Sequence, residues 1–318
     1  MAQPDSSPTH LKIVSLLPST TEIACALGLQ ENLVGRSHEC DFPVGVESLP
    51  VCTAARLDSS LPSGAIDRQV KTILSQGLSV YEVHTDLLRT LKPNIILTQD
   101  QCEVCAVSLK EVEAAVCGWL GQDARIVSCS PMGLSDIWTD IQAVADACDL
   151  PERGHALVSR MTDRLEKIAV LASTQVTKPR VACIEWLEPL MSAGNWVPEL
   201  VSLACGINLF GQAGEHSPWF SWSDIQQADP DILMVLACGF SLKRTRTEMP
   251  CLTSLPGWSS LRAVQNQQVY LTDGNQYFNR PGPRLIESLE ILAEIFHPQS
   301  FNFGHENQAW ERFPSVNQ

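Results

Sequence analysis

Short apolar runs alternate with helical periods along most of the chain. Runs of strand length stand at 11–17, 94–99, 125–131, 180–190 and 231–239. Between them lie segments whose apolar residues recur every three to four positions, at 19–28, 66–77, 84–93, 108–121, 134–150, 197–206, 221–230 and 284–298. Strands that alternate with helices of this length predict right-handed crossovers and parallel sheets. The expected fold class is therefore α/β.

One helical segment is longer than a crossover needs. It runs without a break from Pro151 to Thr174, and the alternation restarts after Lys178 and Pro179. We therefore predict two Rossmann-like lobes with parallel sheets, joined by one long interlobe helix. The expected parts are an N-terminal lobe at 11–150, the interlobe helix at 151–176, a C-terminal lobe at 177–298 and a tail at 299–318. In the tail, apolar residues do not recur at the spacing of a helix or a strand, so the tail is expected either to fray or to pack as an extended strap.

Two short segments in the two predicted lobes are alike. KPNIIL at 92–97 and DPDILM at 229–234 each begin a strand from a proline turn after a short helix. A proline at this place ends the preceding helix. The likeness indicates the same helix–strand module in both lobes, which would then be pseudo-symmetric and face one another across a cleft.

The composition of the chain excludes some classes of binding partner and bears on its location in the cell. The chain has 318 residues, of which 44% are hydrophobic and 18% charged, so it is long enough for two compact domains. A formal net charge of -14 makes nucleic acid and anionic membranes unfavourable partners. No run of 18 apolar residues occurs, so no membrane span is expected. Residues 1–10 resemble no secretory signal, which predicts a cytoplasmic protein, or a periplasmic one if the true start codon lies upstream.

Four of the twelve cysteines fall at predicted edges of the cleft, and the absence of a visible signal predicts that they are reduced. Cys102 and Cys105 form a C-x-x-C after the strand at 94–99, Cys238 ends the strand at 231–239, and Cys40 lies in a polar loop. Thiolates at such spacing hold zinc or an iron–sulfur cluster, so these four are the candidate metal ligands. The alternative is that they only fill turns. The other eight are expected to pack as small apolar residues: Cys25, Cys52, Cys117, Cys129, Cys148, Cys183, Cys205 and Cys251.

Polar and aromatic residues gather in three further loops. His38 and Glu39 precede Cys40 and Asp41, so four possible ligands stand in a row. Trp196 lies in a loop before a helix, where a flat apolar ligand could stack, although core packing is the alternative. Three residues ahead of a Pro-Gly-Pro turn form a possible clamp for a carboxylate, amide or phosphate, namely Tyr277, Asn279 and Arg280. The alternative for Arg280 is an ion pair at a helix entrance.

Five segments carry a resemblance to a known family. They are KIVSLLPSTTEIACALGLQENLVGRSHECDFP, KPNIIL, EPLMSAGNWVPELVSLACG, WSDIQQADPDIL and NRPGPRLIESLEILAE. In content and order they resemble the cobalamin-binding and iron-complex-binding proteins of ABC importers, over residues 11–298.

The resemblance implies reversible, non-catalytic binding of a corrinoid such as cobalamin, or a related metal complex, in a cleft between the lobes. It places one set of residues against the ligand: Pro18, Ser19, Thr20, His38, Glu39, Trp196, Tyr277, Asn279 and Arg280. It also implies docking on an ABC permease through acidic residues at the outer tips of the lobes, for which Asp86 and Asp224 are the nearest matches.

An enzymatic function is not expected from the motifs. The sequence has no GxSxG, HExxH, GxxxxGK[ST] or GxGxxG, and its seven histidines include no i, i+4 pair. The alternative function is a cytosolic metal- or iron–sulfur-binding redox or sensor protein on the same scaffold. That protein would use Cys40, Cys102, Cys105 and Cys238.

Overall fold

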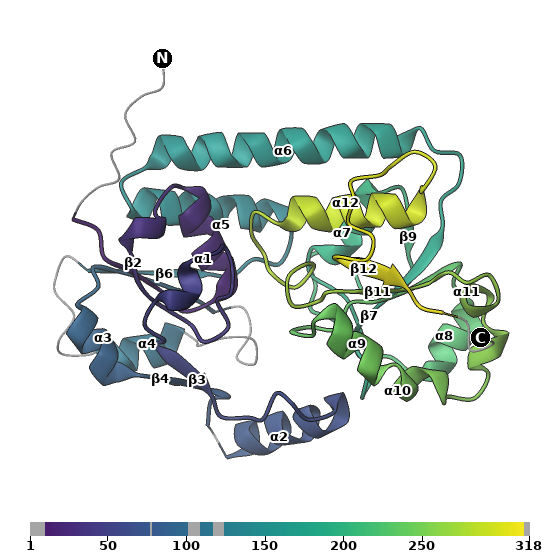
Figure 1. Cartoon of the computed structure of the whole chain (residues 1–318), viewed down its shortest axis with the longest axis horizontal. Coiled ribbons are helices and arrows are strands. Elements are labelled where there is room, and N and C mark those ends of the chain that lie inside the picture. The colour runs from purple at the N-terminus through teal and green to yellow at the C-terminus, as the bar shows by residue number, and fades with distance from the viewer. Residues whose placement is uncertain (1–9, 77, 101–108, 117–123, 315–318) are drawn as a thin grey trace. The chain divides into compact units, whose positions relative to one another are not determined.

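The computed structural model describes residues 10–76, 78–100, 109–116 and 124–314 (Figure 1). It confirms an α/β fold of parallel sheets and helices. Contacts divide the described residues into two compact units. Unit 1 takes its residues from 10–61, 68–131 and 135–160, and unit 2 takes them from 62–67, 132–134 and 161–314. The long helix α6 (Pro151–Ser173) contributes to both units. The lobe boundaries expected from the sequence stay a prediction.

Unit 1 is built on a sheet of four parallel strands in the order β2-β1-β5-β6. These strands are β1 (Ile13–Ser15), β2 (Leu33–Arg36), β5 (Ile95–Gln99) and β6 (Arg125–Cys129). The central strands β1 and β5 are buried along their whole length, as continuous apolar runs in parallel sheets usually are. The longer helices begun in this part of the chain are α1 (Pro18–Ala26), α2 (Ser63–Ser75), α3 (Thr85–Leu91), α4 (Leu109–Val116) and α5 (Leu134–Ala147).

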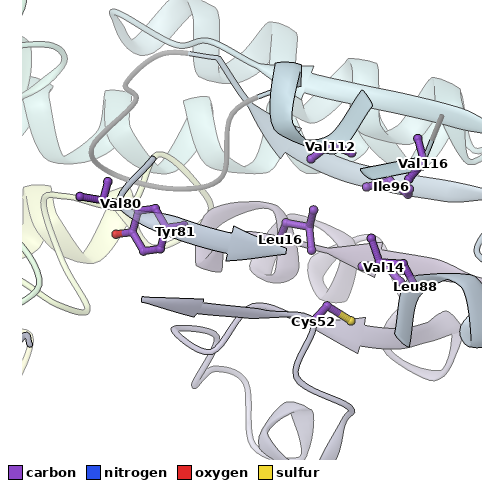
Figure 2. Close-up of a cluster of buried hydrophobic side chains, with 9 residues drawn as sticks. All are labelled: Val14, Leu16, Cys52, Val80, Tyr81, Leu88, Ile96, Val112 and Val116. Carbon is purple, nitrogen blue, oxygen red and sulfur yellow. The ribbon is translucent and has the colours of Figure 1, made fainter. Parts of the chain in front are cut away.

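A separate antiparallel pair, β3 (Thr53–Ala55) with β4 (Tyr81–Val83), packs beside this sheet. Figure 2 shows the buried cluster that joins the two, with Val14 and Ile96 from the sheet, Tyr81 from β4 and Cys52 just before β3. Cys52 is fully buried here, which fits the packing role expected for it. The sequence did not predict this pair, because strands of three residues are too short to show an alternation.

Unit 2 contains a sheet in the order β12-β11-β10-β7-β8, with β9 also on β7. The parallel strands are β7 (Arg180–Trp186), β9 (Ile207–Asn208), β10 (Ile232–Val235) and β11 (Val269–Thr272). The antiparallel ones are β8 (Met191–Ser192) and β12 (Trp310–Arg312). Its helices are α7 (Val197–Leu203), α8 (Trp222–Ala228), α9 (Leu242–Glu248), α10 (Pro250–Thr253), α11 (Arg262–Gln265) and α12 (Leu285–Phe296).

The repeated proline turn has the same backbone geometry in both units. Lys92 ends α3 with φ 49° and Asp229 ends α8 with φ 43°, both in the left-handed region. Each donates its backbone N–H to a carbonyl four residues earlier, and a proline then blocks further helix. The helix–strand module expected from KPNIIL and DPDILM is therefore confirmed.

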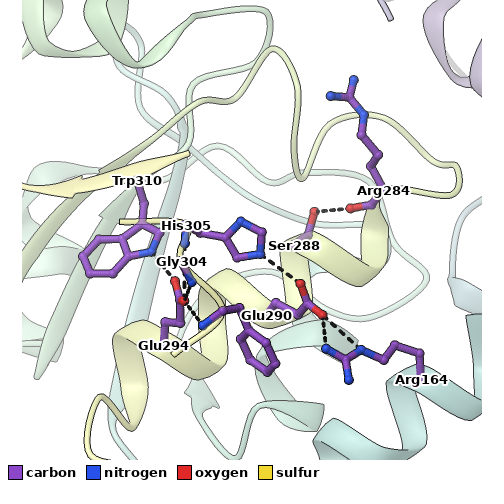
Figure 3. Close-up of polar contacts among 9 residues, drawn as sticks. Arg164, Arg284, Ser288, Glu290, Glu294, Gly304, His305 and Trp310 are labelled. Carbon is purple, nitrogen blue, oxygen red and sulfur yellow. Dashed lines mark hydrogen bonds and ion pairs between the residues drawn. The ribbon is translucent and has the colours of Figure 1, made fainter. Parts of the chain in front are cut away.

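The segment after α12 packs on that helix. Of the two alternatives expected for the tail, residues 299–314 therefore pack and do not fray. Glu294 is 4% exposed, and its carboxylate accepts the backbone N–H of Phe303, the N–H of Gly304 at 2.7 Å and the indole N–H of Trp310 at 2.7 Å (Figure 3). One turn earlier, Glu290 is bonded to Arg164 and to His305 at 2.9 Å. Two carboxylates of α12 thus hold the segment in place.

The His305–Glu290 bond gives the stability a pH dependence. This hydrogen bond raises the pKa of His305 above its ordinary 6.5. A raised pKa in the folded state stabilises the fold fully below the unfolded pKa, and that contribution is lost as the pH rises through the folded pKa. We expect His305→Gln to lower the free energy of unfolding by about 1–2 kcal/mol near pH 5.5. The loss should shrink as the pH is raised beyond about 7, in urea unfolding at each pH.

The matched control for this experiment is His155→Gln, because His155 is an exposed histidine of α6. It should leave the unfolding midpoint unchanged at every pH. A destabilisation by His305→Gln that is the same at low and high pH would contradict the assignment of a protonated His305.

Candidate functional site

Unit 1 presents a set of polar loops at one edge of its sheet. Because β1, β2, β5 and β6 are all parallel, their carboxyl ends meet at that edge. Ligand sites of open α/β sheets lie outside the carboxyl ends of the strands. At this edge α1 begins at Pro18, after β1, and the loop after β2 contains Ser37, His38, Glu39 and Cys40. This edge is the candidate site of unit 1.

The loop after β1 is held by a network of hydroxyl groups. Ser15 Oγ lies 2.7 Å from Thr20 Oγ1 and accepts a hydrogen bond from Thr21 Oγ1 at 2.8 Å. Both threonine hydroxyl oxygens also lie 3.2 Å from the Leu17 carbonyl oxygen. Thr20 is therefore used to join β1 to α1, and Ser19 beside it is 3% exposed. Pro18 is half-buried at the first position of α1. Ligand contacts from Pro18, Ser19 and Thr20 stay a prediction.

His38 has a fixed orientation in the loop after β2. Its Nδ1 lies 2.8 Å from Thr53 Oγ1, and its backbone N–H donates to the same oxygen at 3.1 Å. Thr53 Oγ1 in turn donates to Ser37 Oγ at 3.1 Å. The ring centroids of His38 and Tyr81 are 5.6 Å apart. Thr53 was not picked out from the sequence, because β3 itself was not predicted.

Glu39, Arg36 and His84 complete this neighbourhood. The Tyr81 hydroxyl donates to Glu39 Oε1 at 3.3 Å. Burial lowers the pKa of His38, and the nearby Arg36 and His84 lower it further. His38 is therefore a neutral imidazole at neutral pH, and a neutral imidazole is a metal ligand and a hydrogen-bonding group.

The four candidate metal cysteines are only partly described. Cys40 is 1% exposed and its Sγ lies 3.0 Å from Thr21 Oγ1, so its thiol points beneath the loop that contains His38. Cys238 belongs to unit 2 and is half-buried after β10. Cys102 and Cys105 lie outside the described residues. Among the residues that are described, no three His, Cys, Asp or Glu side chains gather as metal ligands would. The shared metal site stays a prediction.

Several of the remaining cysteines have the environment of packing residues. Burial raises the pKa of Cys25 to about 12, of Cys52 to about 11 and of Cys183 to about 12. A thiol binds a metal or reacts as its thiolate. These groups therefore stay protonated, as expected of cysteines that serve as small apolar residues.

Unit 2 has a corresponding edge where β7, β10 and β11 end. There the ring centroids of Trp186 and Phe240 are 5.3 Å apart, and the Arg244 guanidinium lies 4.7 Å from the centroid of Phe240. Arg244 also pairs with the buried Glu248 at 3.1 Å. Arg244 was missed from the sequence, because α9 has almost no apolar period. The only sequence signal was Ser241, which caps that helix.

The loop after β11 contains the three residues expected to form a polar clamp. Asn279 Nδ2 donates to the carbonyls of Leu236 at 3.1 Å and Gly274 at 2.8 Å, so its amide fixes the loop. Arg280 is 6% exposed and donates to Asn275 Oδ1 at 3.1 Å. Tyr277 is half-buried, with the Arg284 guanidinium 5.5 Å from its ring centroid. These side chains share one loop, and their action on a ligand stays a prediction.

Trp196 lies in the core of unit 2. It is 5% exposed, and its indole N–H donates to the Phe278 carbonyl at 2.7 Å. Its position directly before α7 ties that helix to the loop after β11. The packing alternative given for Trp196 thus agrees with its surroundings.

The two acidic residues expected to meet a permease are both exposed in the first turn of a short helix. The Asp86 side chain is 99% exposed, with Arg89 at 3.5 Å. Asp224 accepts hydrogen bonds from the backbone N–H and the hydroxyl of Ser221, which lower its pKa. Their docking role stays a prediction.

Comparison with known proteins gives related sequences along most of the chain. A family model described as periplasmic binding protein matches residues 13–276. The chain is 25% identical over 299 residues to an uncharacterized ABC transporter substrate-binding lipoprotein of Bacillus subtilis (strain 168), which covers 91% of this chain and 81% of that protein. It is 24% identical over 287 residues to a vitamin B12-binding protein of Vibrio cholerae serotype O1, covering 89% and 87%.

Solved structures match in fold. The periplasmic vitamin B12 binding protein of Vibrio cholerae gives a TM-score of 0.63 at 21% identity, covering 89% of this chain and 95% of that one. A periplasmic heme-binding protein from Roseiflexus sp. RS-1 in apo form gives 0.68 at 22% identity, covering 91% and 99%.

The expected cytoplasmic location is wrong. The matched model is that of periplasmic binding proteins, one relative is a lipoprotein, and the matched structures are of periplasmic proteins. The lack of a secretory pattern in residues 1–10 therefore did not predict the location. Within the described ranges, no helix is both long and apolar enough to cross a membrane.

Proposed function

Since this chain belongs to the periplasmic binding protein family, we propose that it reversibly binds a corrinoid or a related metal macrocycle such as heme and delivers it to an ABC permease. The family consists of solute-binding proteins, so the chain is a binding protein and not an enzyme. The sensor alternative based on four cysteines has no support among the relatives.

The observation that carries the proposal is the likeness to proteins named for vitamin B12 binding, which extends over nine tenths of the chain. The site geometry agrees with it. The carboxyl edge of unit 1 offers a neutral imidazole at His38 beside the aromatic ring of Tyr81. The corresponding edge of unit 2 offers Trp186 and Phe240. Aromatic rings and an imidazole suit a flat, apolar ligand with a metal at its centre.

Titration of the purified protein with cobalamin, cobinamide and hemin tests the proposal. We expect saturable quenching of tryptophan fluorescence, and a change in the ligand's absorbance, with at least one of the three. The same titration of the urea-unfolded chain should show neither. The proposal fails if none of the three ligands produces a saturable change.

A further inference from the structure

The hydrogen bonds around Thr53 fix the ring of His38. Thr53 Oγ1 accepts the backbone N–H of His38 at 3.1 Å and lies 2.8 Å from its Nδ1. A threonine hydroxyl has one proton to donate and two lone pairs to accept with. When Thr53 donates that proton to Ser37 Oγ, 3.1 Å away, its oxygen accepts from Nδ1. The neutral ring then carries its proton on Nδ1 and a free lone pair on Nε2.

This arrangement presents Nε2 as a ligand. The other ring nitrogen is fixed by an oxygen partner, which is how proteins orient a metal-binding histidine and set its tautomer. Thr53 is 1% exposed and Ser37 3%, so the supporting hydroxyls are built into the unit, whereas His38 is half-buried. In the described part of the chain, Nε2 of His38 has no hydrogen-bond partner.

Resting on the proposed function, we propose that His38 Nε2 is an axial ligand to the metal of the bound macrocycle. The lone pair of Nε2 forms a bond to Fe(III) or Co(III), a water molecule leaves that axial position, and the oxidation state does not change. The site should then select macrocycles whose metal has an exchangeable axial position. It should discriminate against the metal-free ring and against complexes whose axial positions are blocked.

His84 is the nearest competitor for this role. Its Nδ1 lies 3.0 Å from the Val51 carbonyl, which can only accept, so Nδ1 carries a proton. However, His84 precedes α3 next to the antiparallel pair, whereas His38 lies two residues after the end of β2 in the parallel sheet. His84→Gln is therefore the matched control variant.

The experiment compares ligands that differ only at the metal. The wild-type protein should bind hemin at least about tenfold more tightly than metal-free protoporphyrin IX, and diaquocobinamide more tightly than dicyanocobinamide. Bound hemin should show the absorbance and electron paramagnetic resonance spectra of an iron with an imidazole ligand. His38→Ala should lose that spectrum and about tenfold or more in hemin affinity. Added free imidazole should restore the spectrum.

Two variants separate ligation from folding. His84→Gln should keep the imidazole spectrum. Thr53→Val keeps the shape of the side chain but removes the acceptor for Nδ1, so it should weaken and broaden that spectrum while His38 is still present. Thr53 is thus a positioning residue.

The outcomes distinguish this inference from the proposed function. If the wild-type protein binds none of the ligands, the proposed function fails. If it binds hemin or cobinamide and His38→Ala leaves the spectrum and the affinity unchanged, only the axial role of His38 is overturned. Loss of the spectrum in His84→Gln alone would assign that role to His84 instead.

Discussion

Replacing Gly274 with alanine should destabilise unit 2 by about 3 kcal/mol, because an added methyl group has no room there. A Cβ atom at this position would lie 2.1 Å from the Ala237 carbonyl oxygen and 2.7 Å from that of Leu236. Both neighbours are backbone atoms of the segment that follows β10, so no side chain can rotate away. The loop after β11 would have to shift, and with it the hydrogen bond from Asn279 to the Gly274 carbonyl.

Urea unfolding of Gly274→Ala gives the free energy, and Gly239→Ala is the matched control. Gly239 has φ +73°, and nothing lies within 4 Å of an added Cβ. Its substitution should cost only the backbone strain, about 1 kcal/mol. We also expect Gly274→Ala to lower the affinity for the ligand, whereas the affinity of Gly239→Ala should stay closer to that of the wild-type protein. Equal unfolding midpoints for the two variants would contradict the steric argument.

Replacing Glu294 with alanine should cost about 2–3 kcal/mol of folding free energy, because the buried indole N–H of Trp310 and two partly buried backbone N–H groups lose one common acceptor. The carboxylate receives the N–H groups of Phe303 and Gly304 and the indole N–H of Trp310 (Figure 3). Without it, the indole N–H of Trp310 stays buried without this acceptor unless water enters or the segment detaches. Urea unfolding and limited proteolysis between residues 299 and 310 measure the two effects.

The control for this variant is Glu306→Ala, which removes an exposed carboxylate from the same segment. It should change the free energy of unfolding by no more than about 0.5 kcal/mol. Trp310→Phe should fall between the two, because it removes one donor and keeps a ring next to Tyr270. If Glu294→Ala and Glu306→Ala unfold alike, the carboxylate does not hold the segment.

Helices and strands were predictable from the sequence where their apolar residues form a continuous run or recur at a regular spacing. The runs at 94–99 and 231–239 became β5 and β10, and the repeated proline turn kept its geometry at Lys92 and Asp229. The helix α9 was not predictable in this way. Its buried residues include Thr245 and Glu248, so its packing leaves no apolar period in the sequence.

The candidate site was less predictable, because adjacent loop residues point in different directions. His38 and Cys40 are two positions apart and looked like equal candidates for one metal. The structure buries Cys40 against Thr21 and fixes His38 through Thr53. Neither partner is near in sequence, since Thr21 comes from α1 and Thr53 from β3. Such distant hydroxyls, and not the local run of ligand-like residues, determine the orientation of each side chain.

The segment that Glu290 and Glu294 hold against α12 has a further consequence for solubility. β12 pairs antiparallel with β11, whose residues Val269–Thr272 are all buried. An uncovered strand of this composition would present unpaired backbone groups to other copies of the chain, and such edges promote aggregation. The short strand Trp310–Arg312 covers the edge of β11. It then forms the outer edge of the sheet itself, and that edge has two charged residues, Glu311 and Arg312. By holding this segment, the two carboxylates of α12 therefore help to keep the edge of β11 from pairing with other copies of the chain.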